Sequence, residues 1–252
     1  MSMKVLSIVL ISVGCSTTIG VIAGLLIRVL PHKLNDIVMG FSAGIMLAAA
    51  TAGLLSTSFT SNISSIPLAI SGALTGAMII SLLDRFIPHL HRLAGIDFEE
   101  HKNGTISKSL LFVAALAIHK IPEGLAVGVS FGTGEIGDVL TIASAISIQN
   151  IPEAFVIVAP LFAIGVKSPR IISISFAIAF VSIISVLAGC LLVSMFSGVL
   201  PFLLAAAGGA MLYVISDEII PETHAHGFEK QSTFALIIGF LLVLAIQSLF
   251  GK

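Results

Sequence analysis

Charged residues are scarce in this sequence: Asp, Glu, Lys and Arg together make up 10% of its 252 residues. A soluble domain carries roughly 25% charged residues, so this chain cannot cover a globule with water-soluble side chains. This excludes a cytosolic or secreted enzyme. The formal net charge of −1 leaves no excess of basic residues for nucleic acid. The remainder is apolar, with 57% hydrophobic residues and a mean hydropathy of +1.14, which excludes a disordered chain.

Cysteine and tryptophan are also rare. The two cysteines, Cys15 and Cys190, lie inside apolar runs, whereas a disulfide framework or a C-x-x-C zinc site would place them in loops. We interpret both as small core residues. Tryptophan is absent, so the chain lacks one of the usual anchors at membrane interfaces.

Long charge-free runs dominate the sequence. A transmembrane helix needs about 20 mostly apolar residues, and two runs, 37–83 and 171–216, have twice that length. The first run is expected to divide at a turn from Ser56 to Ser65, and the second at Ser197 to Pro201. The sequence predicts an all-α polytopic membrane protein, a single transmembrane domain over residues 1–252. Its eight helices are expected at 4–30, 35–58, 66–88, 108–131, 139–166, 170–196, 200–222 and 232–251.

The apolar stretch from Val5 to Ile27 has an alternative interpretation as a cleaved signal peptide. Its apolar region exceeds the usual length of about 7–15 residues, and no small-x-small cleavage site follows it. We therefore expect a helix there.

Lys and Arg are distributed unevenly among the connections. Nine of the twelve lie after the first, third, fifth and seventh spans, and the opposite side has only the terminal Lys4 and Lys252. Because cytoplasmic loops carry the excess of Lys and Arg, both termini are expected outside the cell (inner or plasma) membrane. The connection between helices 3 and 4, with His89, His91 and His101, is then cytoplasmic.

Three charged residues lie at the predicted midplane: Lys120, Glu123 and Glu153. An ionised side chain there costs about 2.5–3.5 kcal/mol even on the lenient insertion scales, so such residues indicate function. The segments that carry them are alike, His119-Lys-Ile-Pro-Glu123 and Gln149-Asn-Ile-Pro-Glu153. Residues four apart share a helix face. This spacing places an imidazole, two carboxylates and an amide oxygen at one level, a mixed site suited to a divalent first-row metal.

A structural role is the alternative for this cluster. In that case Lys120 pairs with a glutamate and His119 caps a buried network. It leaves unexplained why two Ile-Pro-Glu helices carry matched pairs of potential ligands.

Two further segments indicate inverted repeats. Gly40-Phe-Ser-Ala-Gly-Ile-Met46 in the second span and Ala207-Gly-Gly-Ala-Met211 in the seventh are alike but run in opposite senses across the membrane. The sequence therefore predicts that helices 1–3 and 6–8 are repeats around helices 4 and 5.

The paired Ile-Pro-Glu motifs resemble the helix 4 and helix 5 signatures of the ZIP family of divalent metal transporters, in its GufA-like prokaryotic branch. The resemblance covers essentially the whole chain and includes the Ile-Ile-Pro-Glu222-Thr-His224 ending of helix 7. It implies a carrier with elevator-like motion whose midplane site uses His119, Glu123, Gln149 and Glu153. It also implies a possible thioether ligand at Met46.

The resemblance fails at the second metal position of two-metal ZIP proteins. Those proteins have Asn, Asp and Glu where this chain has Lys120, Asn150 and, by alignment, Ser182. All three differences remove negative charge or add positive charge. We therefore expect one metal ion, with the Lys120 ammonium in place of the second.

Polar residues at the inner end of helix 7 resemble the cytoplasmic exit of the family: Asp217, Glu218, Glu222, His224 and His226. A solvated helix end explains them nearly as well. For Asp36 and Asp84, at the inner ends of helices 2 and 3, we favour the solvated helix end.

We therefore expect a non-enzymatic membrane transporter that carries a divalent metal, zinc first, toward the cytoplasm. Iron, manganese, cobalt and cadmium are other candidate substrates. The expected partners are the metal, the lipid bilayer and a second copy of the chain in a homodimer, with no cofactor and no nucleic acid. The alternatives are a gated metal channel and an intramembrane metal-dependent hydrolase, although the latter's H-E-x-x-H motif is absent.

Overall fold

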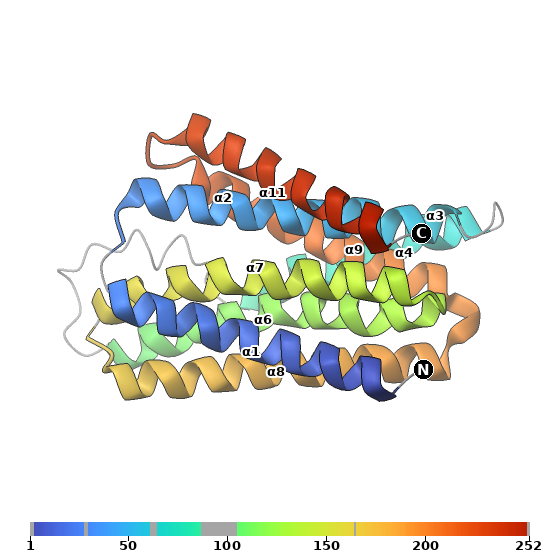
Figure 1. Ribbon diagram of the computed structural model, residues 1–252, viewed down its shortest axis with the longest axis horizontal. Helices are drawn as coiled ribbons and strands as arrows, with labels where there is room; N and C mark the ends of the chain where they lie inside the picture. Colours follow the sequence, from blue (N-terminus) through green and yellow to red (C-terminus); the bar gives the residue numbers. More distant parts are fainter. Residues whose placement is uncertain (1–2, 28–29, 61–64, 87–104, 164, 251–252) are drawn as a thin grey trace.

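The computed structural model describes residues 3–27, 30–60, 65–86, 105–163 and 165–250 (Figure 1). Regular structure in these ranges is entirely helical. The elements are α1 (Met3–Ile27), α2 (His32–Ala48), η1 (Ala49–Leu55), α3 (Ser56–Thr60), α4 (Ile66–Phe86), α6 (Thr105–Ser130), η3 (Phe131–Thr133), α7 (Ile136–Ala163), α8 (Ser168–Met195), η4 (Ser197–Val199), α9 (Leu200–Val214), η5 (Ile215–Ile219), α10 (Ile220–Thr223) and α11 (Glu229–Phe250).

These elements form eight rods of membrane-spanning length within the described residues. Seven of them are long and apolar enough to cross a membrane, and α6, with 26 residues, is the eighth. Two rods are composite, because α2 continues through η1 into α3 and α9 continues through η5 into α10. The predicted all-α polytopic fold with eight helices is confirmed.

The turn predicted to begin at Ser56 begins later, because α3 continues the helix as far as Thr60. The hydroxyls of Thr57 and Thr60 each bond a carbonyl one turn back, that of Gly53 at 2.6 Å and that of Ser56 at 2.8 Å. Hydroxyl groups that bond the carbonyl four residues back destabilise a helix only slightly, so a run of Ser and Thr is no reliable signal for a turn.

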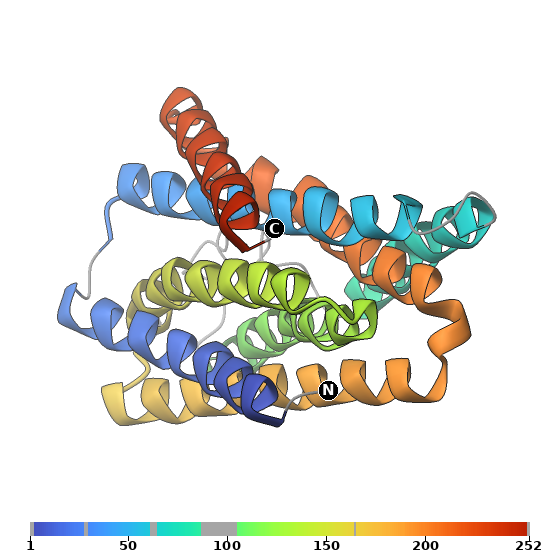
Figure 2. The same cartoon turned by 45° about the vertical axis from the view of Figure 1, so that its right-hand side comes forward.

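The rods form two groups, which also contact each other, chiefly through α2 with α7 and α6 with α9. Figure 1 and Figure 2 show their arrangement. The α6–α7 group contains α1, α6, α7 and α8, in which α1 packs on α7 and α6 packs on α8. The α2–α9 group contains the α2 and α9 rods with α4 and α11, in which α2 packs on α11 and α4 packs on α9. The start of α1 and the end of α11 lie at the same end of the bundle (Figure 1).

The pairing of rods follows the predicted inverted repeats. The repeat relates α1 to α8, the α2 rod to the α9 rod, α4 to α11, and α6 to α7. It thereby converts the α1–α7 pair into the α8–α6 pair, and the α2–α11 pair into the α9–α4 pair. The two similar segments that end at Met46 and Met211 are followed by π-helical segments at matching positions, η1 after Met46 and η5 after Met211. Such segments occur frequently at functional sites.

Glycine allows the closest helix contacts in the α6–α7 group. A β-carbon at Gly20 on α1 would collide with the carbonyl oxygen of Ile151 on α7. One at Gly124 on α6 would lie 2.7 Å from the carbonyl oxygen of Ser182 on α8. Small residues at such contacts let membrane helices approach closely, and these contacts position the two Ile-Pro-Glu segments.

Candidate metal centre

The Lys120 side chain lies at the centre of a buried polar cluster between α6 and α7. Its Nζ donates hydrogen bonds to Glu123 Oε2 at 2.7 Å, to Asn150 Oδ1 at 2.7 Å and to Glu153 Oε2. Lys120 and Glu123 are each 2% exposed. An ammonium has three N–H donors, and each of them reaches a different oxygen. The cluster is therefore a cation site in which the cation belongs to the chain.

The Glu153 carboxylate is held by residues from two helices besides the Lys120 contact. Its Oε1 accepts hydrogen bonds from Gln149 Nε2 at 3.0 Å and from Ser42 Oγ on α2 at 2.9 Å. The predicted side-by-side placement of Gln149 and Glu153 is thus present on α7. Gln149 is fully buried, and its Oε1 accepts no hydrogen bond from the described residues. A buried acceptor without a donor is costly, whereas an amide oxygen in that state suits a metal ligand.

The His119 side chain reaches the other helix group. Its Nε2 lies 2.9 Å from Glu218 Oε2 on η5, and both side chains are largely buried. The sequence predicts Glu218 at the exit of the transport path rather than beside His119. The structure therefore joins one predicted exit residue directly to one predicted ligand.

Within the part of the chain that the structure describes, no three His, Cys, Asp or Glu side chains are close enough together to hold a metal ion as they stand. Lys120 lies between Glu123 and Glu153, and His119 is drawn toward Glu218. A metal ion at this level would require these side chains to reorient.

The other predicted exit residues are dispersed. Asp217 is exposed and Glu222 is half-buried. The ring nitrogens of His224 bond the Ile220 carbonyl at 2.8 Å and the Thr233 hydroxyl at 3.0 Å. His226 pairs with a residue of α2 instead. These residues do not gather around one point in this structure.

The prediction that Asp36 lies at a solvated helix end is wrong. Asp36 is completely buried, and its Oδ1 lies 3.1 Å from His226 Nδ1. The His226 ring stacks on His32 with the centroids 4.8 Å apart. The segment after α10 folds back over the start of α2 and covers the carboxylate. The structure does not describe the side chain of Asp84, and the histidines of the connection between helices 3 and 4 (His89, His91 and His101) lie outside the described residues.

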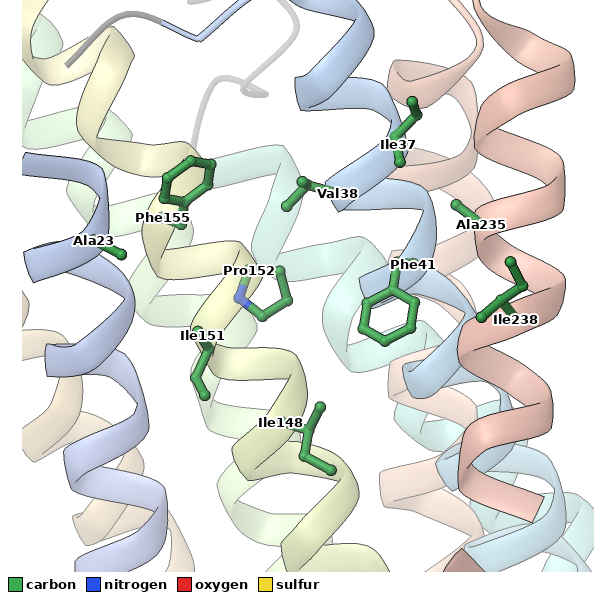
Figure 3. A pocket seen from close by; sticks show the side chains of 10 residues that line it. All are labelled: Ala23, Ile37, Val38, Phe41, Ile148, Ile151, Pro152, Phe155, Ala235 and Ile238. Atoms are coloured by element: carbon green, nitrogen blue, oxygen red, sulfur yellow. The ribbon is translucent and has the colours of Figure 1, made fainter. Parts of the chain in front are cut away.

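An apolar crevice of about 530 Å³ opens between the two helix groups beside the cluster (Figure 3). Its lining includes Phe41 and Val38 from α2 and Pro152 and Ile148 from α7, and α1 and α11 complete it. Phe41 and Pro152 directly precede Ser42 and Glu153 in the chain. The surfaces of the two groups are therefore apolar around the hydrogen bond between Ser42 and Glu153.

Comparison with known proteins assigns the family. A family model described as ZIP zinc transporter matches residues 88–247. The zinc transporter GufA of Myxococcus xanthus is 38% identical over 181 residues, which cover 72% of this chain and 70% of that protein. The zinc transporter ZIPB of Bordetella bronchiseptica is 32% identical over 252 residues, which cover 94% of this chain and 78% of that protein. The chain belongs to the ZIP family. The resemblance identified from the Ile-Pro-Glu motifs is confirmed, and the chain is a multi-pass membrane protein.

The ZIP second-metal positions lie in or beside the cluster. Lys120 contacts both glutamates rather than one, and Asn150 accepts one of its hydrogen bonds. The Ser182 hydroxyl bonds its own helix at the Ile178 carbonyl, 3.3 Å away. Ser182 is buried next to Gly124 and adds no charge there.

Helix α1 contributes to the cluster in a way that sequence analysis missed. Asn150 Nδ2 donates to Ser16 Oγ at 3.2 Å and lies 3.5 Å from the Val13 carbonyl oxygen. These bonds fix the amide so that its oxygen faces Lys120. The available signal was a run of three hydroxyl residues, Ser16, Thr17 and Thr18, in the middle of an apolar span.

Met46 is buried on α2 one turn beyond Ser42, on the same helix face. Met46 is packed in the main hydrophobic core. Its ligand role stays a prediction.

Proposed function

We propose that this chain carries a divalent metal ion, with zinc as the preferred candidate, toward the cytoplasm through a site formed by His119, Glu123, Gln149 and Glu153. The relatives reported above are described as zinc transporters. The chemistry of the four side chains supports the same substrate. One imidazole, two carboxylates and one amide oxygen suit borderline metals such as zinc.

One observation carries the proposal: two glutamates on neighbouring helices converge on a cation inside an apolar bundle. Burying ionised carboxylates is costly unless a positive charge or several hydrogen bonds compensate them. A protein that needed only stability would be better served by apolar residues at these positions. The arrangement is explained if the carboxylates serve to strip water from a passing cation.

Each residue then has a distinct task. Glu123 and Glu153 supply the negative charge that replaces the hydration shell of the metal. His119 supplies the nitrogen ligand that favours zinc over harder ions. Gln149 supplies a neutral oxygen that is already buried and without a donor. Glu218, paired with His119, is the first group toward the exit.

We propose a stoichiometry of one metal ion per site. Lys120 compensates one of the two glutamates, and a single divalent ion balances the other together with Glu218. A second divalent ion would leave a large excess of positive charge in a low-dielectric environment, where unit charges interact strongly. Lys120 thus takes the place of the second metal found in two-metal ZIP proteins.

Uptake into proteoliposomes tests the proposal. We expect uptake of radiolabelled Zn²⁺ to saturate and to respond to a gradient of Zn²⁺ from the opposite side of the membrane. A carrier shows this behaviour and a channel does not. Glu123→Ala should abolish it in protein that is still folded and inserted. Glu135→Ala, at an exposed glutamate outside the cluster, is the matched control. Uptake by Glu123→Ala equal to that of the unmodified chain would refute the site.

Orientation is part of the same proposal. Nine loop cations lie on one side of the predicted topology, which supports a cell membrane location with both termini outside. In a chain without its native cysteines, new cysteines beside Met1 and Lys252 should react with an impermeant thiol reagent from outside, and one at Asn103 should not. The reverse pattern would invert the proposed direction. We also expect a homodimer, which mass measurement in detergent would test.

A further inference from the structure

Two polar contacts join the helix groups at the level of the cluster. Ser42 Oγ on α2 donates to Glu153 Oε1 on α7 at 2.9 Å. Glu218 Oε2 on η5 lies 2.9 Å from His119 Nε2 on α6. In each case the α2–α9 group supplies a residue that holds a proposed metal ligand of the α6–α7 group.

The boundary around the Ser42 contact is apolar. Phe41 and Pro152 line the crevice of Figure 3 from opposite groups. Within a bilayer, lipid tails are as apolar as these side chains, so such surfaces give little preference for one relative position of the groups. A hydrogen bond to a buried carboxylate does give such a preference, because it is directional and charge-assisted.

The Ser42 contact uses an oxygen that the proposed site also offers to a metal ion. Glu153 Oε1 accepts two hydrogen bonds, from Ser42 and Gln149, while Oε2 faces the Lys120 ammonium. A carboxylate oxygen has about two lone-pair directions. A metal ion that approaches Oε1 must therefore replace one of these donors. Gln149 is on the same helix as Glu153 and remains beside it, whereas Ser42 belongs to the opposite group.

We propose that Ser42 is a positioning residue of the transport site, which holds the Glu153 carboxylate from the opposite helix group until a metal ion takes that carboxylate. This inference rests on the proposed function. Glu218 acts in the same way on His119, since an Nε2 that donates to a carboxylate cannot also bind a metal. Metal binding thus releases these two polar contacts, and the loaded α6–α7 group is freed to move against the α2–α9 group.

Reciprocal coupling gives the direction of the test. A contact that competes with the metal lowers metal affinity, so removing it raises affinity. Ser42→Ala should strengthen Zn²⁺ binding at least about tenfold, given the size of a single hydrogen bond to a charged group. The KM for uptake should fall by a similar factor without a rise in kcat. A variant that merely loosened the packing would instead lose thermal stability and bind no more tightly.

The experiment uses the purified full-length chain in nanodiscs, with Zn²⁺ affinity measured by competition with a fluorescent chelator. Ser147→Ala is the matched control, because it removes the acceptor of a part-buried hydrogen bond of 2.8 Å from Ser12 Oγ inside one helix group. Ser42→Thr keeps the hydroxyl. Both should bind Zn²⁺ as the unmodified chain does.

An unchanged affinity in Ser42→Ala would overturn the inference. So would a weaker one, because Ser42 would then support the metal-bound arrangement. If Ser42→Thr does not fold, the comparison of Ser42→Ala with Ser147→Ala still decides. Failure of the unmodified chain to bind Zn²⁺ would instead refute the proposed function. If Zn²⁺ binds and Glu153→Ala abolishes binding, any failure concerns Ser42 alone.

Discussion

Helices α6 and α7 share the Ile-Pro-Glu motif and differ in what holds it. On α7, Gln149 and Glu153 are joined to each other by a hydrogen bond, and Ser42 supports the pair from α2. On α6, His119 extends to Glu218 in the other helix group, and the Glu123 carboxylate is bonded by Lys120. The α7 half is a set of acceptors already in place. The α6 half contains the cation and His119, the proposed ligand that a bound metal would require to reorient.

The neighbours of the two helices explain this difference. Asn150 on α7 is tied to Ser16 on α1, so α1 and α2 hold the α7 polar residues from both sides. The His119 partner instead lies on η5, a π-helical segment. Two copies of one sequence motif thus acquire different partners through their tertiary contacts.

The largest expected effect comes from removing either glutamate, which tests whether the two helices contribute equally. Glu123→Ala and Glu153→Ala should each reduce Zn²⁺ flux to below about 1% of normal, because each carboxylate supplies charge that a desolvated divalent ion needs. Flux per inserted protein in proteoliposomes measures this. Substantial flux in one variant alone would show that only the other helix carries the ion.

Removing the ammonium tests the proposed role of α6 as the source of positive charge. Lys120→Met leaves two buried carboxylates facing each other, and breaking a buried ion pair costs about 3–5 kcal/mol. We expect a large fall in the Tm of the detergent-solubilised protein and recovery on addition of Zn²⁺. Lys167→Met, at an exposed lysine, should have no such effect. A Tm that Zn²⁺ does not raise in Lys120→Met would contradict the substitution of ammonium for metal.

Replacing the His119 imidazole tests whether the α6 half of the site sets the preference for one metal over another. His119→Ala should weaken Zn²⁺ uptake about tenfold and Mn²⁺ uptake much less, because imidazole suits zinc whereas carboxylate and carbonyl oxygens suit manganese. Competition between the two ions in one uptake assay gives the ratio directly. An equal loss for both ions would mean that His119 serves structure rather than selectivity.

The smallest expected effect concerns the thioether proposed from α2. Met46→Leu conserves volume and should lower Cd²⁺ affinity about threefold with little effect on Mn²⁺, because soft sulfur favours soft metals. Met211→Leu, at the matching position of the inverted repeat, is the control. Equal behaviour of the two variants would assign Met46 to packing.

The spans and the cluster could be predicted from sequence for a simple reason. Hydrophobic run length is a local property, and residues four apart share a face of any helix. Gln149 and Glu153 are therefore adjacent once α7 forms. The Lys120 ion pairs follow in the same way, because few oxygens exist at that depth to satisfy an ammonium.

The remaining features depend on tertiary packing that no local pattern encodes. The partner of His119 is 99 positions away in the sequence, on η5. Ser42 lies within a run of small residues where a serine is an ordinary packing choice. Asp36 was assigned to solvent because it begins a helix, whereas the segment carrying His226 buries it.

Anomalous diffraction from crystals soaked in Cd²⁺ or Zn²⁺ tests the central claim most directly. We expect one peak in contact with Glu123 and Glu153, with the Lys120 ammonium still beside it. The triple variant Lys120→Asn, Asn150→Asp, Ser182→Glu restores the charge expected of two-metal ZIP proteins and should show two peaks. Two peaks about 4 Å apart, the separation usual in two-metal sites, in the unmodified chain would contradict the account, as would a single peak away from both glutamates.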